Sequence, residues 1–246
     1  MTTIISVPDH VFPVHVPLFD IPQLSNNRVF SVFGGTLAES LANHSGRAAG
    51  AAVGTINLEP MGIRQFGTDD YIRFTDIGTL SPAGFTMIIA FRTLQDVAEF
   101  TSGLVNLWSQ TDKNSDTLRR RIFTDGSAGS GPIRTYSFPP PSGPGTNWQG
   151  THDSPYLVSM VRAGNGATSN LRMHNADGTS ITGNTIAVQA TPMLYSVGTV
   201  LEVGNGSTAG SGGSLIQGVA LWDGTMDAAN IAVAAASLAS ASGVFL

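Results

Sequence analysis

The sequence contains no cysteine, which excludes disulfide bonds, thiol nucleophiles and zinc–thiolate sites. Charged residues make up only 12% of the 246 residues, which is about half the usual share for a soluble domain. No apolar run approaches the roughly 18 residues that span a bilayer. We therefore expect a chain that is stabilised by packing or by oligomerisation and that does not insert into a membrane.

Positive charge is also scarce, since the formal net charge is -5 and the isoelectric point is about 5.4. Such a chain has no electrostatic attraction to nucleic acid, so we expect no nucleic-acid partner. Residues 1–20 lack the basic start and continuous apolar core of a signal peptide, because prolines and Asp9 interrupt them. We therefore expect synthesis in the cytoplasm without a leader.

Glycine and proline are abundant, with 29 and 13 residues, and they separate many short apolar runs. This pattern predicts an all-β fold with two packed antiparallel sheets. We place the sandwich domain at residues 31–246. The predicted strands are 71–74, 85–93, 103–110, 120–125, 133–138, 156–162, 170–175, 201–205 and 214–224.

Two segments carry the clearest periodicity. Both faces of "FTMIIAFRT" (85–93) are apolar, which predicts a central strand that is covered on both sides. The alanine-rich segment 226–243 instead has helical spacing, with Asp227 as the N-cap and Gly243 after the last turn. We expect one short C-terminal helix whose buried face contains Ile231, Ala234, Ala235 and Leu238.

Residues 1–30 differ from the rest of the chain. Prolines at positions 8, 13, 17 and 22 prevent a helix and disfavour a central strand, although the segment is rich in Val, Phe, Leu and Ile. An extended apolar arm is therefore predicted. Such an arm would pack along its own domain or dock on another protein.

The order of segments resembles the laminin-G-like or concanavalin A-like lectin/glucanase superfamily. The resemblance rests on "NHSGRAAGAAVGTINLEPMGIRQFGTDDYIRF" (43–74), "GFTMIIAFR" (84–92), "YLVSMVRAGNGATSNLRMHNADG" (156–178) and "LIQGVALWDGTMDAANIAVAA" (215–235). It implies two antiparallel sheets with jelly-roll connections. Members of this superfamily include sugar-binding modules, adhesion domains, glycanases, and surface or fibre proteins of bacteriophages.

The hairpin at 156–178 pairs two predicted strands. Strand alternation places Leu171 and Met173 inward and Arg172 and His174 outward. The three tryptophans divide in the same way, because Trp108 and Trp222 lie in strand runs and are predicted to pack inside. Trp148 lies in a polar loop.

Catalytic motifs are absent. The related glucanases place two carboxylates on one strand, whereas none of the four glutamates, Glu39, Glu59, Glu99 and Glu202, shares its strand with another. No Gly-x-Ser-x-Gly sequence marks a nucleophile. His44, His152 and His174 are scattered and are predicted to lie at the surface or in turns. We therefore predict that the protein is not an enzyme. The open alternative is a catalytic carboxylate pair formed by aspartates that are distant in the sequence.

One loop has the alternating oxygen ligands that calcium prefers. Asp112, Asn114 and Asp116 occupy alternate positions, but Thr117 stands where an EF-hand has glycine. The alternatives are a calcium site and an ordinary polar hairpin loop. No other cofactor is expected.

The candidate glycan site centres on Trp148, with Asn147, Gln149, His152 and Asp153 around it. An exposed aromatic ring with neighbouring polar groups suits a sugar, whereas burial of Trp148 against its own loop or another subunit is the alternative.

The predicted function is a non-enzymatic structural or adhesion module with glycan binding. The resemblance suggests a bacteriophage virion surface protein, acting as a capsid decoration, head fibre or tail adhesin. Its arm would contact other virion proteins, it would form a homo-oligomer such as a trimer, and its loops would meet host-surface glycans. The alternatives are a glycoside hydrolase and a free bacterial lectin.

Overall fold

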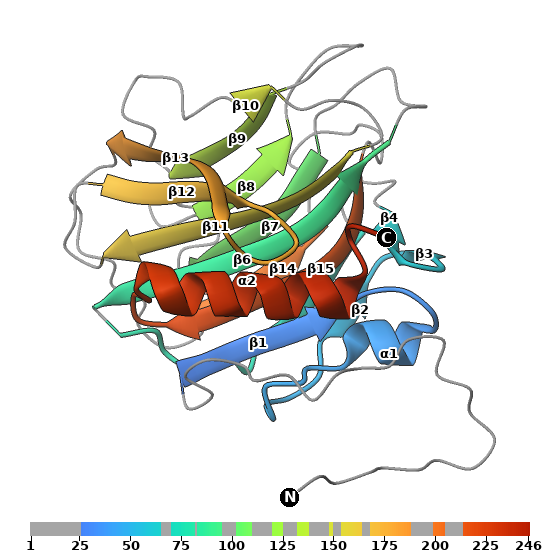
Figure 1. Cartoon of the computed structure of the whole chain (residues 1–246). Coiled ribbons are helices and arrows are strands. Elements are labelled where there is room, and N and C mark those ends of the chain that lie inside the picture. The colour runs from blue at the N-terminus through green and yellow to red at the C-terminus, as the bar shows by residue number, and fades with distance from the viewer. Residues whose placement is uncertain are drawn as a thin grey trace, which may run out of the picture.

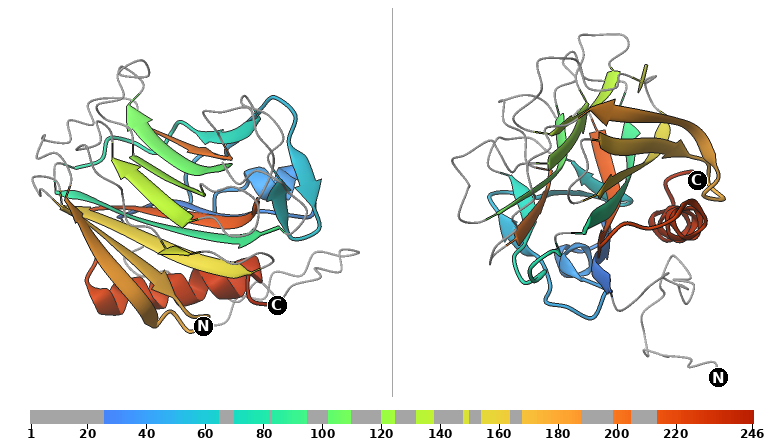
Figure 2. Two further views of the ribbon diagram at one scale, coloured as in Figure 1. Left: turned by 90° about the horizontal axis from the view of Figure 1, so that it is seen from above. Right: turned by 90° about the vertical axis from the view of Figure 1, so that its left-hand side faces the viewer.

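The computed structural model describes residues 26–64, 70–81, 83–94, 102–109, 120–124, 132–137, 148–149, 154–163, 168–187, 199–204 and 214–246. Within these ranges the chain is an all-β sandwich of two antiparallel sheets with a C-terminal helix, as the sequence predicts (Figure 1). The two sheets form separate layers, and α2 (Ala228–Ser242) lies on the outer side of one of them (Figure 2).

We call the sheet beneath α2 sheet A, and it has eight strands in the described part of the chain. Its order is β13-β12-β11-β6-β15-β4-β3, and β1 also pairs with β15. The strands are β1 (Asn27–Val32), β3 (Asn57–Glu59), β4 (Gly62–Arg64), β6 (Gly84–Thr93), β11 (Pro155–Ala163), β12 (Thr168–His174), β13 (Ser180–Ala187) and β15 (Ser214–Asp223).

Sheet B has seven described strands in the order β10-β9-β8-β7-β14-β5-β2. They are β2 (Ala51–Val53), β5 (Tyr71–Phe74), β7 (Ser102–Ser109), β8 (Arg120–Thr124), β9 (Pro132–Ser137), β10 (Trp148–Gln149) and β14 (Thr199–Val203). The chain changes sheet repeatedly, for example from β6 to β7, from β10 to β11, from β13 to β14 and from β14 to β15. These crossings give the jelly-roll connectivity.

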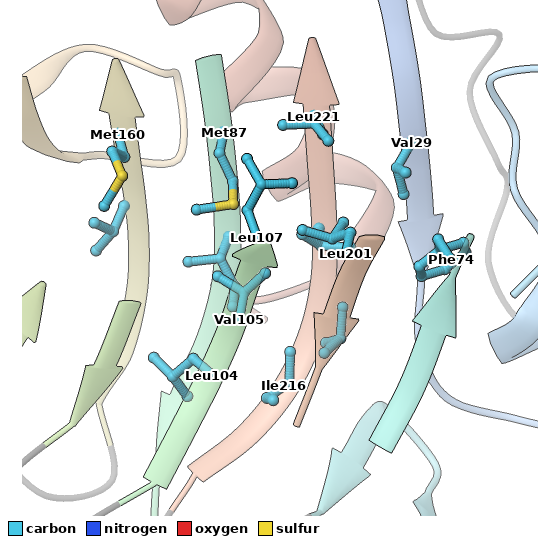
Figure 3. Packing of buried hydrophobic residues seen from close by; sticks show 14 of the residues in the cluster. Val29, Phe74, Met87, Leu104, Val105, Leu107, Met160, Leu201, Ile216 and Leu221 are labelled. Carbon is cyan, nitrogen blue, oxygen red and sulfur yellow. The ribbon is translucent and has the colours of Figure 1, made fainter. Parts of the chain in front are cut away.

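The main core fills the space between the two sheets. Strand alternation in both sheets turns apolar side chains into this layer, where they are almost fully buried. Figure 3 shows side chains from both sheets meeting there, among them Val29, Phe74, Met87, Leu104, Val105, Leu107, Met160, Leu201, Ile216 and Leu221.

A second core lies between sheet A and α2. Ile88 and Ala90 of β6 face this side, whereas Met87, Ile89 and Phe91 of the same strand face the main core. The prediction of a central strand covered on both sides is therefore confirmed. Trp222 is also fully buried in this second core, as predicted, and the side chain of Trp108 lies outside the described residues.

Helix α2 begins and ends at the predicted residues. The Asp227 carboxylate caps it by accepting a 2.8 Å hydrogen bond from Asn230 N. Gly243 adopts left-handed backbone after the last turn. The face predicted to be buried, Ile231, Ala234, Ala235 and Leu238, packs on sheet A.

The sandwich begins earlier than the predicted boundary at residue 31. Strand β1 starts at Asn27 and pairs with β15, because no proline follows Pro22 in this part of the chain. Residues 1–25 lie outside the described residues, so the arm stays a prediction. Helix α1 (Leu37–Leu41) follows β1 and has a capping box formed by Thr36 and Glu39.

No helix in the described ranges is long and apolar enough to cross a membrane.

Candidate functional site

The outer face of sheet B carries a polar cluster where β5, β14 and β7 lie side by side. Leu201 and Val203 of β14 point into the main core, so alternation turns Glu202 to the opposite face. The strand register pairs Glu202 with Arg73 on one side and with Asn106 on the other. Three polar residues from three strands therefore lie in one row across the sheet.

Arg73 and Glu202 form an ion pair with two hydrogen bonds. Oε1 of Glu202 accepts from Nε of Arg73 at 2.9 Å and from Nη2 at 2.7 Å. Nη2 also donates to the hydroxyl of Tyr71, and the guanidinium lies 5.0 Å from the centre of the Tyr71 ring. This arrangement fixes the guanidinium in one orientation.

The members of the cluster differ in exposure. Glu202 is 1% exposed and Asn106 is fully buried, whereas the Arg73 side chain is 24% exposed. The guanidinium is therefore the part of the ion pair that reaches solvent. A buried carboxylate that holds an exposed guanidinium creates a preorganised hydrogen-bond donor.

The described strands of sheet B carry several kinds of polar group on this face. Among the strands that the structure describes in sheet B, Glu202 is the one carboxylate. Glycoside hydrolysis by the usual retaining or inverting mechanisms needs two carboxyl groups. Guanidinium, carboxylate, amide and phenol groups are the planar or polar partners that bind sugar hydroxyls.

The predicted glycan site lies partly on the same sheet. The backbones of Trp148 and Gln149 form the short edge strand β10, in register with Ile133 and Pro132 of β9, whereas a loop was expected. Their side chains lie outside the described residues, as do Asn147, His152 and Asp153. The glycan role of these residues stays a prediction.

The predicted calcium ligands, Asp112, Asn114 and Asp116, also lie outside the described residues. In the part of the chain that is described, no group of three or more His, Asp or Glu side chains could hold a metal ion. Calcium binding by the 110–116 loop therefore stays a prediction.

A second polar cluster lies between sheet A and α2. Ser159 Oγ is 2.7 Å from Nε2 of His174, and Nδ1 of His174 is 2.9 Å from the Gly178 carbonyl oxygen. A carbonyl only accepts, so Nδ1 carries the proton and, in the neutral ring, Nε2 accepts the Ser159 hydroxyl. Burial lowers the pKa of His174, and Arg172 lowers it further, although the Gly178 hydrogen bond opposes both effects.

A hydroxyl that donates to an oriented imidazole is the arrangement that activates a serine nucleophile. Here Ser159 is fully buried and His174 is 2% exposed, so no substrate reaches the hydroxyl. The cluster instead links β11 and β12 to the turn at Gly178, which lies against α2. The prediction of a surface or turn position for His174 was wrong, because the outward face of β12 is covered. His44 is exposed in a turn, as expected, and His152 lies outside the described residues.

Sequence analysis did not identify the Arg73–Glu202 pair. The two residues are 129 positions apart, and their contact depends on the register of β14 with β5. The available signal was Glu202 itself, a single charged residue within the apolar run "TVLEV". An outward polar residue in a buried strand indicates a partner on a neighbouring strand.

Solved structures with a similar fold include a sialidase, a neurotoxin and a domain of an arabinanase. The sialidase of Trypanosoma rangeli has a TM-score of 0.56 and 14% identity over 89% of this chain. A structure of botulinum neurotoxin type C, a toxin whose cell entry depends on two ganglioside molecules, has a TM-score of 0.56 and 12% identity over 87% of this chain. Domain 4 of a GH43 extracellular arabinanase of Geobacillus stearothermophilus, in complex with arabinotriose, has a TM-score of 0.54 and 11% identity over 85%.

The extent of these matches differs. This chain spans 33% of the sialidase chain and 52% of the neurotoxin chain, but 98% of the arabinanase domain. No family model matches the sequence, and no curated protein matches it. At such low identity the likeness shows the fold alone. It confirms the two-sheet sandwich that the superfamily resemblance implied, and the laminin-G-like branch and the bacteriophage association stay predictions.

Proposed function

We propose that this chain is a non-enzymatic binding module that recognises polysaccharide through the outer face of sheet B. The observation that carries this proposal is the Arg73 side chain, which is 24% exposed and whose guanidinium is held by the buried Glu202 carboxylate. On the other outer face of the sandwich, α2 packs on apolar side chains of sheet A, and the Ser159–His174 pair on that face is buried. Sheet B is therefore the layer with polar groups for a ligand.

The solved structures of similar fold support a carbohydrate ligand. One of them is a domain bound to arabinotriose, and another belongs to a toxin whose cell entry depends on gangliosides. The arabinanase domain has nearly the same extent as this chain. Trp148 lies on the edge strand of the same sheet and is the proposed aromatic contact, with Asn147, Gln149, His152 and Asp153 as polar neighbours.

The competing enzyme function is a glycoside hydrolase. It would need a second carboxylate about 5 Å from Glu202 for retention or about 6.5–9.5 Å away for inversion. Glu202 is instead paired with Arg73 and is the one acidic residue on the described strands of sheet B. We therefore propose binding without cleavage.

The finer proposal concerns the biological setting. A bacteriophage virion surface protein, as a capsid decoration, head fibre or tail adhesin, suits the predicted arm before β1, the absence of cysteine and the superfamily resemblance. In this setting the arm contacts other virion proteins, the chain forms a homo-oligomer such as a trimer, and it binds a host-surface glycan outside the cell. Co-purification with phage particles, lost on deletion of residues 1–25, is the expected result. A truncated protein that still assembles would rule out docking through the arm.

The glycan proposal is tested with a panel of neutral and acidic bacterial polysaccharides, measured by affinity electrophoresis and calorimetry. Arg73→Lys keeps the charge beside Glu202 but removes the two-pronged hydrogen bonding, and we expect roughly fivefold weaker binding. Trp148→Ala is expected to abolish binding. Val233→Ser, on the exposed side of α2, is the control and should bind like the unsubstituted protein. Equal affinity in all four proteins would contradict the proposed binding face.

A further inference from the structure

Two arginine side chains meet at the turn that follows β5. A Cβ atom built on Gly78 would lie 3.5 Å from Nη1 of Arg47 and 3.6 Å from Nη1 of Arg28. Gly78 is exposed, Arg47 is half-buried and the Arg28 side chain is 17% exposed. The two guanidinium groups therefore border one small space that solvent reaches.

The carboxylates near this space do not balance both arginines. Nη2 of Arg28 donates to Oδ2 of Asp223 at 2.6 Å, and Oδ1 of Asp223 accepts from Ser81 N at 2.7 Å. Burial raises the pKa of Asp223, but the hydrogen bonds from Ser81 and Arg28 outweigh it and hold the pKa below its usual value. Asp76, in the same turn, is exposed and forms no ion pair. One carboxylate thus compensates one of two guanidinium groups.

Both arginines keep unused donors. Within the described residues Arg47 forms no hydrogen bond and no ion pair. Nε of Arg28 is buried without a hydrogen-bond partner. A guanidinium carries five N–H donors in a plane that matches the oxygens of a carboxylate. An anionic group beside Gly78 would accept hydrogen bonds from the Nη1 atoms of both arginines.

The two arginines are held on a fixed frame. The Asn43 side chain accepts hydrogen bonds from Phe30 N at 3.1 Å and Ser45 N at 3.2 Å. It also donates to the carbonyl oxygens of Arg28 at 3.2 Å and Ala48 at 3.3 Å. Asn43 therefore ties the loop that carries Arg47 to the strand that carries Arg28. Such preorganisation lowers the entropy loss on binding.

We propose that Arg28 and Arg47 bind one carboxylate of an acidic sugar residue in the space beside Gly78. The identity of the ligand rests on the proposed polysaccharide binding, whereas the anion site rests on the geometry of the two arginines. The turn follows β5, the strand that carries Arg73, so an acidic polysaccharide would meet both features along one strand. The net charge of -5 gives the chain no general attraction to polyanions, so the attraction to an acidic sugar would come from these two arginines.

The test measures binding of polygalacturonate and of its methyl ester, which lacks the charge, by calorimetry on the full chain. Arg47→Gln removes an arginine without a partner, so the fold should persist, and we expect about tenfold weaker binding of polygalacturonate. Binding of the methyl ester should not change. Arg64→Gln on sheet A makes the same change in net charge and should leave both affinities unchanged. Equal weakening by Arg47→Gln and Arg64→Gln would overturn the site.

Competition separates the chemical sources of the anion. Free galacturonate should displace the polymer from the unsubstituted protein, and inorganic phosphate at the same concentration should not. Displacement by phosphate alone would overturn the carboxylate assignment. The protein could bind neutral polysaccharide, lose that binding in Arg73→Lys and show no preference for polygalacturonate. That result would rule out the anion site and support the proposed function. If binding of polygalacturonate instead needs Arg47 but not Arg73, the anion site would stand and the proposed binding face on sheet B would be ruled out.

Discussion

The hydroxyl of Ser159 donates a 2.7 Å hydrogen bond to Nε2 of His174, which lies 15 residues later on the neighbouring strand. Both side chains are buried, and the opposite ring nitrogen donates to the Gly178 carbonyl. The neutral ring satisfies both of its nitrogens in this position. A second proton would remove the acceptor that Ser159 uses.

This relationship predicts a pH dependence of stability. The pKa of His174 is lowered in the folded protein, mainly by burial, whereas the unfolded chain has the ordinary value of about 6.5. The unfolded state therefore binds more protons below about pH 6.5, and stability falls as the pH decreases from that value toward the lowered folded pKa. Urea denaturation at pH 7.5 and 5.5 should show this loss.

The control for this prediction is His174→Gln, whose side chain does not titrate. Its free energy of unfolding should be lower than that of the unsubstituted protein at pH 7.5, and the gap should narrow at pH 5.5. A constant gap at both pH values would show that His174 does not titrate differently in the folded and unfolded states.

The turn between β12 and β13 should tolerate no side chain at Gly178. A Cβ atom there would lie 1.8 Å from the Ala232 carbonyl oxygen of α2, so Gly178→Ala should lower the free energy of unfolding by about 3 kcal/mol or more. Gly224 has the same left-handed backbone with no atom within 4 Å of an added Cβ. Gly224→Ala should therefore lower the free energy of unfolding by only about 1–2 kcal/mol, the cost of placing a side chain on left-handed backbone. Equal losses would mean that the turn does not pack on α2.

The Arg73–Glu202 pair should show strong coupling. Arg73→Met removes the guanidinium that pairs with the buried Glu202 carboxylate and should destabilise the protein by about 3 kcal/mol. The double variant Arg73→Met, Glu202→Gln removes both charges and should recover most of that loss. Urea denaturation of both variants measures this coupling. A single variant as stable as the unsubstituted protein would show that Glu202 is not held in the buried position.

Local patterns in the sequence predicted the strands and the helix in which buried residues recur at regular strand or helix spacing. In β6 the prediction of two apolar faces was confirmed, because a continuous apolar run needs cover on both sides. The C-terminal helix was confirmed at its capping residue Asp227 and at Gly243. These features depend on neighbouring residues alone, so a single sequence contains the information.

Features that depend on distant contacts were not predictable in the same way. Alternation placed His174 outward from the main core, which is where it lies, but it could not show that the outward side is covered. The Arg73–Glu202 pair and the Arg28–Arg47 pair depend on strand register and loop placement between remote segments. The sites predicted from the sequence lie around Trp148 and in the 110–116 loop, and the side chains of both lie outside the described residues.

The protein is proposed to bind polysaccharide without cleaving it. One incubation of the protein with polysaccharide, in which bound polysaccharide and newly formed reducing ends are both measured over time, tests this proposal. We expect saturable binding that weakens in Arg73→Lys, with no increase in reducing ends. Release of reducing ends by the unsubstituted protein that stops in Glu202→Gln would contradict it.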